Sequence, residues 1–270
     1  MPRKFYFDTD IFRNIGKTFE NAALPNDLRG NLLVSPLSAF EVISQLSTAA
    51  GDEILRQIHA IRNWVNPERA GMLPWPDDVL LNVGFGMPMR EDDFTQRMAN
   101  AFKICLAATS VEPLREEAHR VKEMLDETKL RNAQDFGRLL KAARRESPKG
   151  DWFSDPWYQG IARRVNANPE TRSADAIAAT FNAYREFERV KLQTALKEKD
   201  YNVEKHKNDL FDAEQLIYLG SPDLYFLTCD KGFSRVNQSA QFERVMIVPL
   251  DEISDVHRVE ALLRKQLSAV

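Results

Sequence analysis

Two short apolar runs near opposite ends of the chain each lead into an aspartate, and they constrain the fold more than any other feature. Residues 4–7 run into Asp8, and residues 224–228 are followed closely by Asp230. Short, continuously apolar runs are typical of strands that are buried in a parallel sheet. The carboxyl ends of such strands meet at one edge, where α/β folds place their chemistry. We therefore expect Asp8 and Asp230 to lie near each other at that edge.

Two further acidic residues are expected to lie near the same edge of the sheet. Glu41 lies in a helix expected to begin at Ser35-Pro36, because serine is a good N-cap and proline suits the first helical position. Asp212 lies near the start of a helix expected over 210–219, which precedes the strand at 224–228. Carboxylates gathered at one edge repel one another and are stable together mainly around a hard cation such as Mg²⁺. The sequence thus predicts a metal-dependent site.

The order of the expected elements indicates an α/β fold with a mainly parallel central sheet flanked by helices. Strands are expected at 4–7, 31–34, 224–228 and 245–248, and a closing amphipathic helix at 256–267. Residues 1–65 and 201–270 would form the α/β domain, and 66–200 a mostly helical insertion or cap.

The insertion is expected to have two parts. The proline-rich stretch 66–94 predicts a long irregular connection. From about 95 to 200 the pattern is helical and highly charged, and adds no strand. The stretch 183–207 carries seven Lys or Arg and five Asp or Glu, which predicts an exposed helix.

The composition limits the class of protein. A 43% apolar content supplies a core, and a net charge of −3 argues against a uniformly basic nucleic-acid-binding coat. The two cysteines, Cys105 and Cys229, show no metal-ligand spacing, which fits a reducing compartment. The N-terminus lacks a signal-peptide pattern, and no apolar run is long enough to span a bilayer. We expect a soluble, cytoplasmic protein.

The four acidic segments, taken in order, resemble those of the PIN-domain nucleases. The resembling segments are Phe7-Asp8-Thr9-Asp10, Ser35 to Glu41, Asp212, and Thr228-Cys229-Asp230. The resemblance covers about 4–60 and 205–268 and implies a PIN-like fold. The chain departs from the family in the separation of 171 positions from Glu41 to Asp212 and in Asp10, which stands where asparagine is usual.

This resemblance implies a site that holds Mg²⁺ or Mn²⁺ and hydrolyses phosphodiester bonds. The expected catalytic and metal-binding residues are Asp8, Glu41, Asp212 and Asp230. Asp8 and Asp230 are the natural direct ligands, and Glu41 and Asp212 would bind a second ion or metal-bound waters. The residues expected to support them are Thr9, Asp10, Asp209 and Thr228, with Thr228 donating a hydrogen bond to a ligating carboxylate.

Each acidic residue also has a purely structural reading. Asp8 could cap the following helix, Glu41 could be solvated in mid-helix, and Asp230 could cap the turn at Lys231-Gly232. Asp209 is expected to be an N-cap of the helix that carries Asp212. Because all four acidic residues occur in the expected order, one shared functional site is a stronger interpretation than four separate structural roles.

Basic and aromatic residues of the insertion are candidates for contact with nucleic acid. Arg138, Lys141 and Arg145 are spaced three and four residues apart and so share one helix face, which could follow a phosphate backbone or be a solvated face. The aromatic residues that follow are expected to pack the insertion onto the sheet domain. They are Trp152, Phe153, Trp157 and Tyr158.

The function predicted from these observations is that of a metal-dependent endoribonuclease acting on single-stranded RNA. The resemblance also suggests the toxin of a toxin–antitoxin pair, inhibited by a small protein. Two alternatives stay open: a non-catalytic module that binds nucleic acid or protein, and a structure-specific DNA nuclease. Metal-dependent cleavage of RNA would exclude the non-catalytic module. Equal or better activity on flapped or branched DNA would favour the DNA nuclease.

Overall fold

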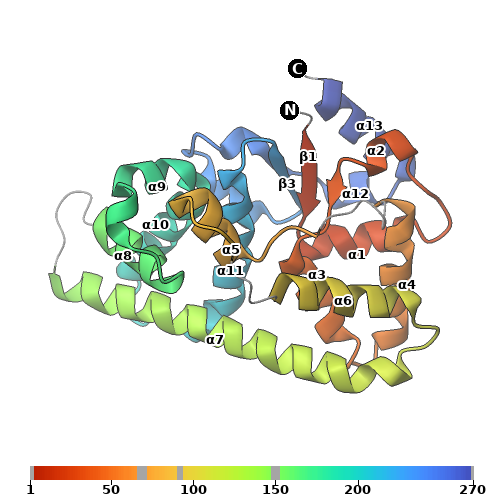
Figure 1. Ribbon diagram of the computed structural model, residues 1–270, viewed down its shortest axis with the longest axis horizontal. Coiled ribbons are helices and arrows are strands. Elements are labelled where there is room, and N and C mark those ends of the chain that lie inside the picture. Colours follow the sequence, from red (N-terminus) through yellow and green to blue (C-terminus); the bar gives the residue numbers. More distant parts are fainter. Residues whose placement is uncertain (1–2, 66–71, 90–93, 147–152, 269–270) are drawn as a thin grey trace.

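The computed structural model describes residues 3–65, 72–89, 94–146 and 153–268. Within these ranges the chain forms one parallel sheet surrounded by helices (Figure 1). The strands are β1 (Lys4–Phe7), β2 (Leu32–Leu33), β3 (Leu224–Thr228) and β4 (Val245–Ile247), in the order β2-β1-β3-β4. The prediction of an α/β fold with a parallel sheet is confirmed.

Helices make up most of the remaining described structure. The α-helices are α1 (Thr9–Thr18), α2 (Asn26–Arg29), α3 (Pro36–Gln45), α4 (Gly51–Ala60), α5 (Pro76–Val79), α6 (Phe94–Ala107), α7 (Arg115–Glu146), α8 (Ser154–Arg164), α9 (Ala174–Thr180), α10 (Asn182–Lys197), α11 (Lys207–Asp212), α12 (Leu250–Ile253) and α13 (Val256–Ser268). A π-helical turn, η2, covers Leu80–Gly84. The 3₁₀-helices are η1 (Ile61–Asn63), η3 (Glu112–Leu114), η4 (Pro169–Thr171), η5 (Val203–His206), η6 (Ala213–Gly220), η7 (Lys231–Val236) and η8 (Phe242–Arg244).

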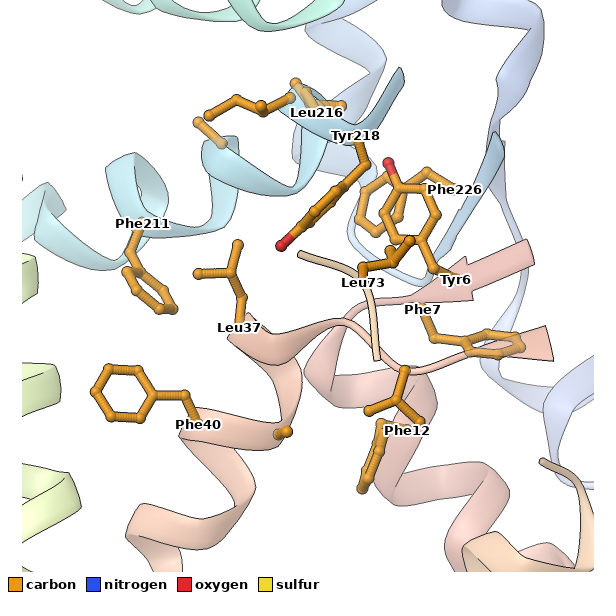
Figure 2. Packing of buried hydrophobic residues seen from close by; sticks show 14 of the residues in the cluster. Tyr6, Phe7, Phe12, Leu37, Phe40, Leu73, Phe211, Leu216, Tyr218 and Phe226 are labelled. Carbon is orange, nitrogen blue, oxygen red and sulfur yellow. The ribbon is translucent and has the colours of Figure 1, made fainter. Parts of the chain in front are cut away.

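The pairing of β1 with β3 joins the two ends of the chain. Phe7 lies opposite Leu227, and Phe5, Tyr6 and Phe7 of β1 are almost fully buried, as a central parallel strand requires. Tyr6 stacks on Phe226 with ring centroids 5.0 Å apart and meets Tyr218 of η6 edge-on (Figure 2). This aromatic cluster fixes the register that places Asp8, just past β1, beside the end of β3.

The insertion is helical where the structure describes it, and it pairs no residue with β1 or β3 there. Its one strand-like contact among the described residues is an isolated bridge from Met72 to Val34. The prediction of an irregular 66–94 connection is wrong for 76–84, where α5 and η2 form, because Pro76 begins a helix readily at its first position. Helix α7 runs along one side of the molecule (Figure 1) and packs against both α3 and α11.

Two further expectations for the insertion can be compared with the structure. Phe153, Trp157 and Tyr158 are buried as predicted, and Trp152 lies outside the described residues. The exposed helix predicted over 183–207 is wrong for α10, which buries Tyr184, Phe187 and Leu192 against the core. The many charges of this stretch obscured an apolar stripe with helical spacing.

Buried ion pairs fasten the insertion to the rest of the fold. Arg164 of α8 lies 2.9 Å from Glu214 of η6 and 2.5 Å from Asp77 of α5. Asn132 of α7 donates a further hydrogen bond of 2.7 Å to Glu214, which is 1% exposed. Two segments of the insertion, α7 and α8, thus converge on a residue two positions after Asp212, and a third, α5, reaches it through Arg164.

No helix in the described part of the chain is both long and apolar enough to cross a membrane.

The buried ion pairs generate a prediction about stability. Arg164→Met should lower the free energy of unfolding by about 3–5 kcal/mol, because Glu214 and Asp77 lose their counter-ion while buried. Urea denaturation measures the change. Arg138→Met is the control, since Arg138 pairs with Asp135 on the surface and its loss should cost less than about 1 kcal/mol. Equal effects of the two substitutions would show that the Arg164 pairs do not hold the insertion in place.

Candidate active site

Asp8 lies at the carboxyl end of β1 and is held by two donors. Its Oδ1 accepts a hydrogen bond of 2.8 Å from the backbone N–H of Ile11, so it is the N-cap of α1. Its Oδ2 accepts a hydrogen bond from Thr228 Oγ1, as predicted for Thr228. Burial nevertheless raises the pKa of Asp8 to about 7, with a smaller contribution from the charge of Asp10. The prediction that Asp8 caps the following helix is therefore confirmed. The same carboxylate also has a raised pKa.

Asp230 follows β3 and shares Thr228 with Asp8. The Asp230 N–H donates to Thr228 Oγ1 over 2.9 Å, and Asp230 Oδ1 accepts from the N–H of Gly232 over 2.7 Å. The predicted turn cap is confirmed. Thr228 is completely buried and links the ends of β1 and β3 through one hydroxyl group. Thr228 thus links the side chain of Asp8 to the backbone of Asp230 at the sheet edge.

Glu41 is not a solvated mid-helix residue. Its Oε2 accepts a hydrogen bond of 2.5 Å from Thr9, and its Oε1 lies 2.6 Å from Lys129 Nζ of α7. The side chain of Glu41 is 15% exposed and that of Lys129 is 10% exposed. Both oxygens of Glu41 therefore have a protein donor, and one of the donors comes from the insertion.

Asp212 is the last residue of α11 and stands at the N-cap position of η6, where its side chain forms no cap hydrogen bond. The predicted helix over 210–219 is split here, with a change from α to 3₁₀ geometry directly after Asp212. Its side chain is partly buried, and no described residue donates a hydrogen bond to it. Burial, followed by the charge of Glu41, raises its pKa to about 8, and the charge of Asp8 acts in the same direction.

Asp209 lies in the first turn of α11, and its side chain forms no cap, contrary to the prediction. It pairs instead with Lys191 of α10, a lysine that is 4% exposed, and with His206 at 3.5 Å. These partners lower the pKa of Asp209 even though burial acts against them.

A small open pocket of about 150 Å³ brings Asp209, Asp212 and Asp230 together, and Asp8 and Glu41 are not part of its lining. Its lining consists of Phe187, Asp209, Asp212, Asp230, Gly232, Phe233 and Arg235. Phe187 and Phe233 form an apolar floor, and the exposed Arg235 lies over the Phe187 ring at 5.6 Å. The pocket therefore combines three carboxylates with an aromatic floor and a cation at its rim.

The other predicted site residues occupy different positions. Asp10 is exposed beside Asp8. Cys229, next to Asp230, has its pKa raised to about 12 by burial and by the nearby charges of Asp8 and Asp10, so its thiol is not an available nucleophile.

The candidate nucleic-acid-binding face lies on the solvent side of α7. Arg138, Lys141 and Arg145 are all exposed. Arg138 follows Lys129 by nine residues, about two and a half helical turns, so the two side chains point to opposite sides of the helix. The three basic residues are thus turned away from the side of α7 that contacts Glu41.

Three basic residues near the acids were missed by the sequence reasoning: Lys129, Lys191 and Arg235. Lys129 stands in the apolar stripe of α7, following Val121 and Leu125 at four-residue spacing. A lysine at a core position of such a stripe indicates a buried partner of opposite charge. Arg235 follows Asp230 by five residues in η7 and carries no comparable pattern.

The raised pKa values of Asp8 and Asp212 predict how stability depends on pH. Between about pH 4 and pH 8 the folded, metal-free protein binds protons that the unfolded chain has released, so its stability falls as the pH rises through that range. Asp212→Asn should reduce this loss by about 1–3 kcal/mol.

The measurement is urea denaturation at pH 5.5 and 8.5 in the presence of a chelator. Asp175→Asn is the control, because Asp175 is exposed and lies on α9. The same pH dependence in all three proteins would contradict the electrostatic description of Asp212.

In comparisons with known proteins, the chain matches no family model, no curated protein and no solved structure. The functional assignment therefore depends on the chemistry of the site itself.

Proposed function

We propose that the chain is a divalent-metal-dependent nuclease that hydrolyses phosphodiester bonds, with single-stranded RNA as its substrate. The observation that carries the proposal is Asp212: a partly buried carboxylate without a described hydrogen-bond donor, close enough to Asp8 and Glu41 to feel their charges, and in the wall of an open pocket. Such an arrangement costs folding free energy unless a proton or a cation joins it.

The donors present suit Mg²⁺ or Mn²⁺. Among the described residues, no group of three or more His, Cys, Asp or Glu side chains is already arranged around one metal position. Mg²⁺ keeps several waters and needs only one or two carboxylates directly. Asp8, Asp212 and Asp230 offer hard oxygen donors at the same edge and would hold such an ion. When bound, the ion would lower the pKa of a coordinated water and neutralise charge on the phosphodiester.

The surrounding residues have separate tasks in this proposal. Thr228 and the first turn of α1 fix the orientation of the Asp8 carboxylate. Arg235 at the rim offers a positive charge to a substrate phosphate, and the floor of Phe187 and Phe233 gives the pocket an apolar wall. Hydrolysis transfers a water oxygen to phosphorus, breaks one P–O ester bond, and passes a proton to the leaving oxygen.

The choice of RNA, the PIN-like assignment and an inhibitory antitoxin partner are supported by the sequence resemblance and belong to the same proposal. So does a cytoplasmic location, which is supported by the absence of metal-ligand spacing between the two cysteines. The alternative of a non-catalytic binding module has less support, because nothing in binding alone requires buried carboxylates of raised pKa.

Asp8→Asn tests the proposal directly. The substitution keeps the size of the side chain and its cap to Ile11 but removes one charge from the candidate metal ligands. Cleavage of single-stranded RNA with Mn²⁺ should fall by about 100-fold or more. The assay follows a labelled RNA pool with and without Mn²⁺, and Asp175→Asn serves as a control with unchanged activity.

The wild-type result separates the alternatives. Cleavage of flapped or branched DNA at a higher rate than RNA would favour a DNA nuclease. Full activity in Asp8→Asn, or a wild type that cleaves nothing in Mn²⁺, would falsify the metal-nuclease proposal.

A further inference from the structure

Two lysine side chains of the insertion pair with acidic residues of the candidate site. Lys129 of α7 is 8% exposed and Lys191 of α10 is 4% exposed, and each pairs with one acidic residue, Glu41 and Asp209 respectively. Lysine is seldom buried to this degree unless its charge is compensated. The insertion, which the PIN-like pattern does not account for, thus contributes two positive charges to the site.

Glu41 and Asp212 differ in the hydrogen bonds that their carboxylates receive. Glu41 receives Lys129 on one oxygen at 2.6 Å and Thr9 on the other at 2.5 Å. Asp212 receives no hydrogen bond from any described residue. Lys129 is therefore hydrogen-bonded to Glu41, whereas it acts on Asp212 only through its charge, which opposes the rise in the pKa of Asp212.

The surroundings of Lys129 hold its ammonium group in place. Its Nζ lies 5.1 Å from the centroid of the Phe211 ring, which favours a positive charge over its face. Phe211 is 1% exposed and directly precedes Asp212. Because α7 packs against both α3 and α11, the lysine is fixed by the two helices that carry Glu41 and Asp212.

We propose that Lys129 is a built-in cation that takes the place of the second metal ion, so that the site binds one divalent ion, held directly by one or two of Asp8, Asp212 and Asp230. The inference rests on the proposed metal-dependent function and specifies its metal requirement. In two-metal sites the ions stand about 3.5–4 Å apart. An ammonium group hydrogen-bonded to Glu41 occupies that side of the cluster and repels a second divalent ion.

The test counts bound ions in the folded protein. Isothermal titration with Mn²⁺ should give one ion per wild-type chain. Lys129→Met should give two ions per chain, because Glu41 then offers a free carboxylate beside Asp212. Lys129→Arg keeps the charge and should give one ion. Lys122→Met, which removes an exposed lysine from the same helix, should also give one ion.

The outcomes separate this inference from the proposed function. Two ions in the wild type, or a single ion with unchanged affinity in folded Lys129→Met, would overturn the role of Lys129 while leaving a metal-dependent nuclease in place. No Mn²⁺ binding by the wild type would overturn the proposed function, and this inference with it. If Lys129→Met does not fold, the number of Mn²⁺ ions bound by the wild type tests the inference. One ion per chain supports Lys129 as the built-in cation, and two ions per chain overturn it.

Discussion

The parallel pairing of β1 with β3 is the interaction on which the rest of the structure depends. It joins segments from the two ends of the chain, and its register sets Phe7 opposite Leu227. One residue further on, Asp8 meets Thr228, and Thr228 in turn holds the backbone of Asp230. A shift of this register would bury different side chains and separate the two aspartates. The aromatic contacts of Tyr6 with Phe226 and Tyr218 stabilise the register that the site requires.

The insertion contributes residues to the candidate site. Its helix α7 places Lys129 against Glu41, and α10 places Lys191 against Asp209. Arg164 and Asn132 anchor the same segment to Glu214, close to Asp212. Acidic residues that would otherwise repel one another are thus partly neutralised by charges from a separate part of the chain. The two parts also share one continuous hydrophobic core, so the insertion and the sheet support each other.

The strands and the ends of the sheet could be predicted from the sequence, because buried parallel strands leave continuous apolar runs such as 4–7 and 224–228. The cap at Ser35 and the role of Thr228 were predictable for the same local reasons. The break after Asp212 was not, since the apolar pattern continues unchanged from α11 into η6. Lys129 and Lys191 were also missed, because a charged residue in a highly charged helix looks solvated until its partner, far away in the chain, is known. In α7 the position of Lys129 within the apolar stripe was the available sign.

The central claim is that one divalent ion binds at Asp212, which receives no hydrogen bond from a described residue, together with Asp8 or Asp230. Anomalous X-ray diffraction from crystals soaked in Mn²⁺ tests this most directly, because it locates the ion without reference to activity. The account predicts a single manganese peak within about 2.0–2.3 Å of a carboxylate oxygen of at least one of these three aspartates, with Lys129 still bonded to Glu41. A peak between Glu41 and Asp212 with Lys129 displaced, or no peak at this edge of the sheet, would contradict it.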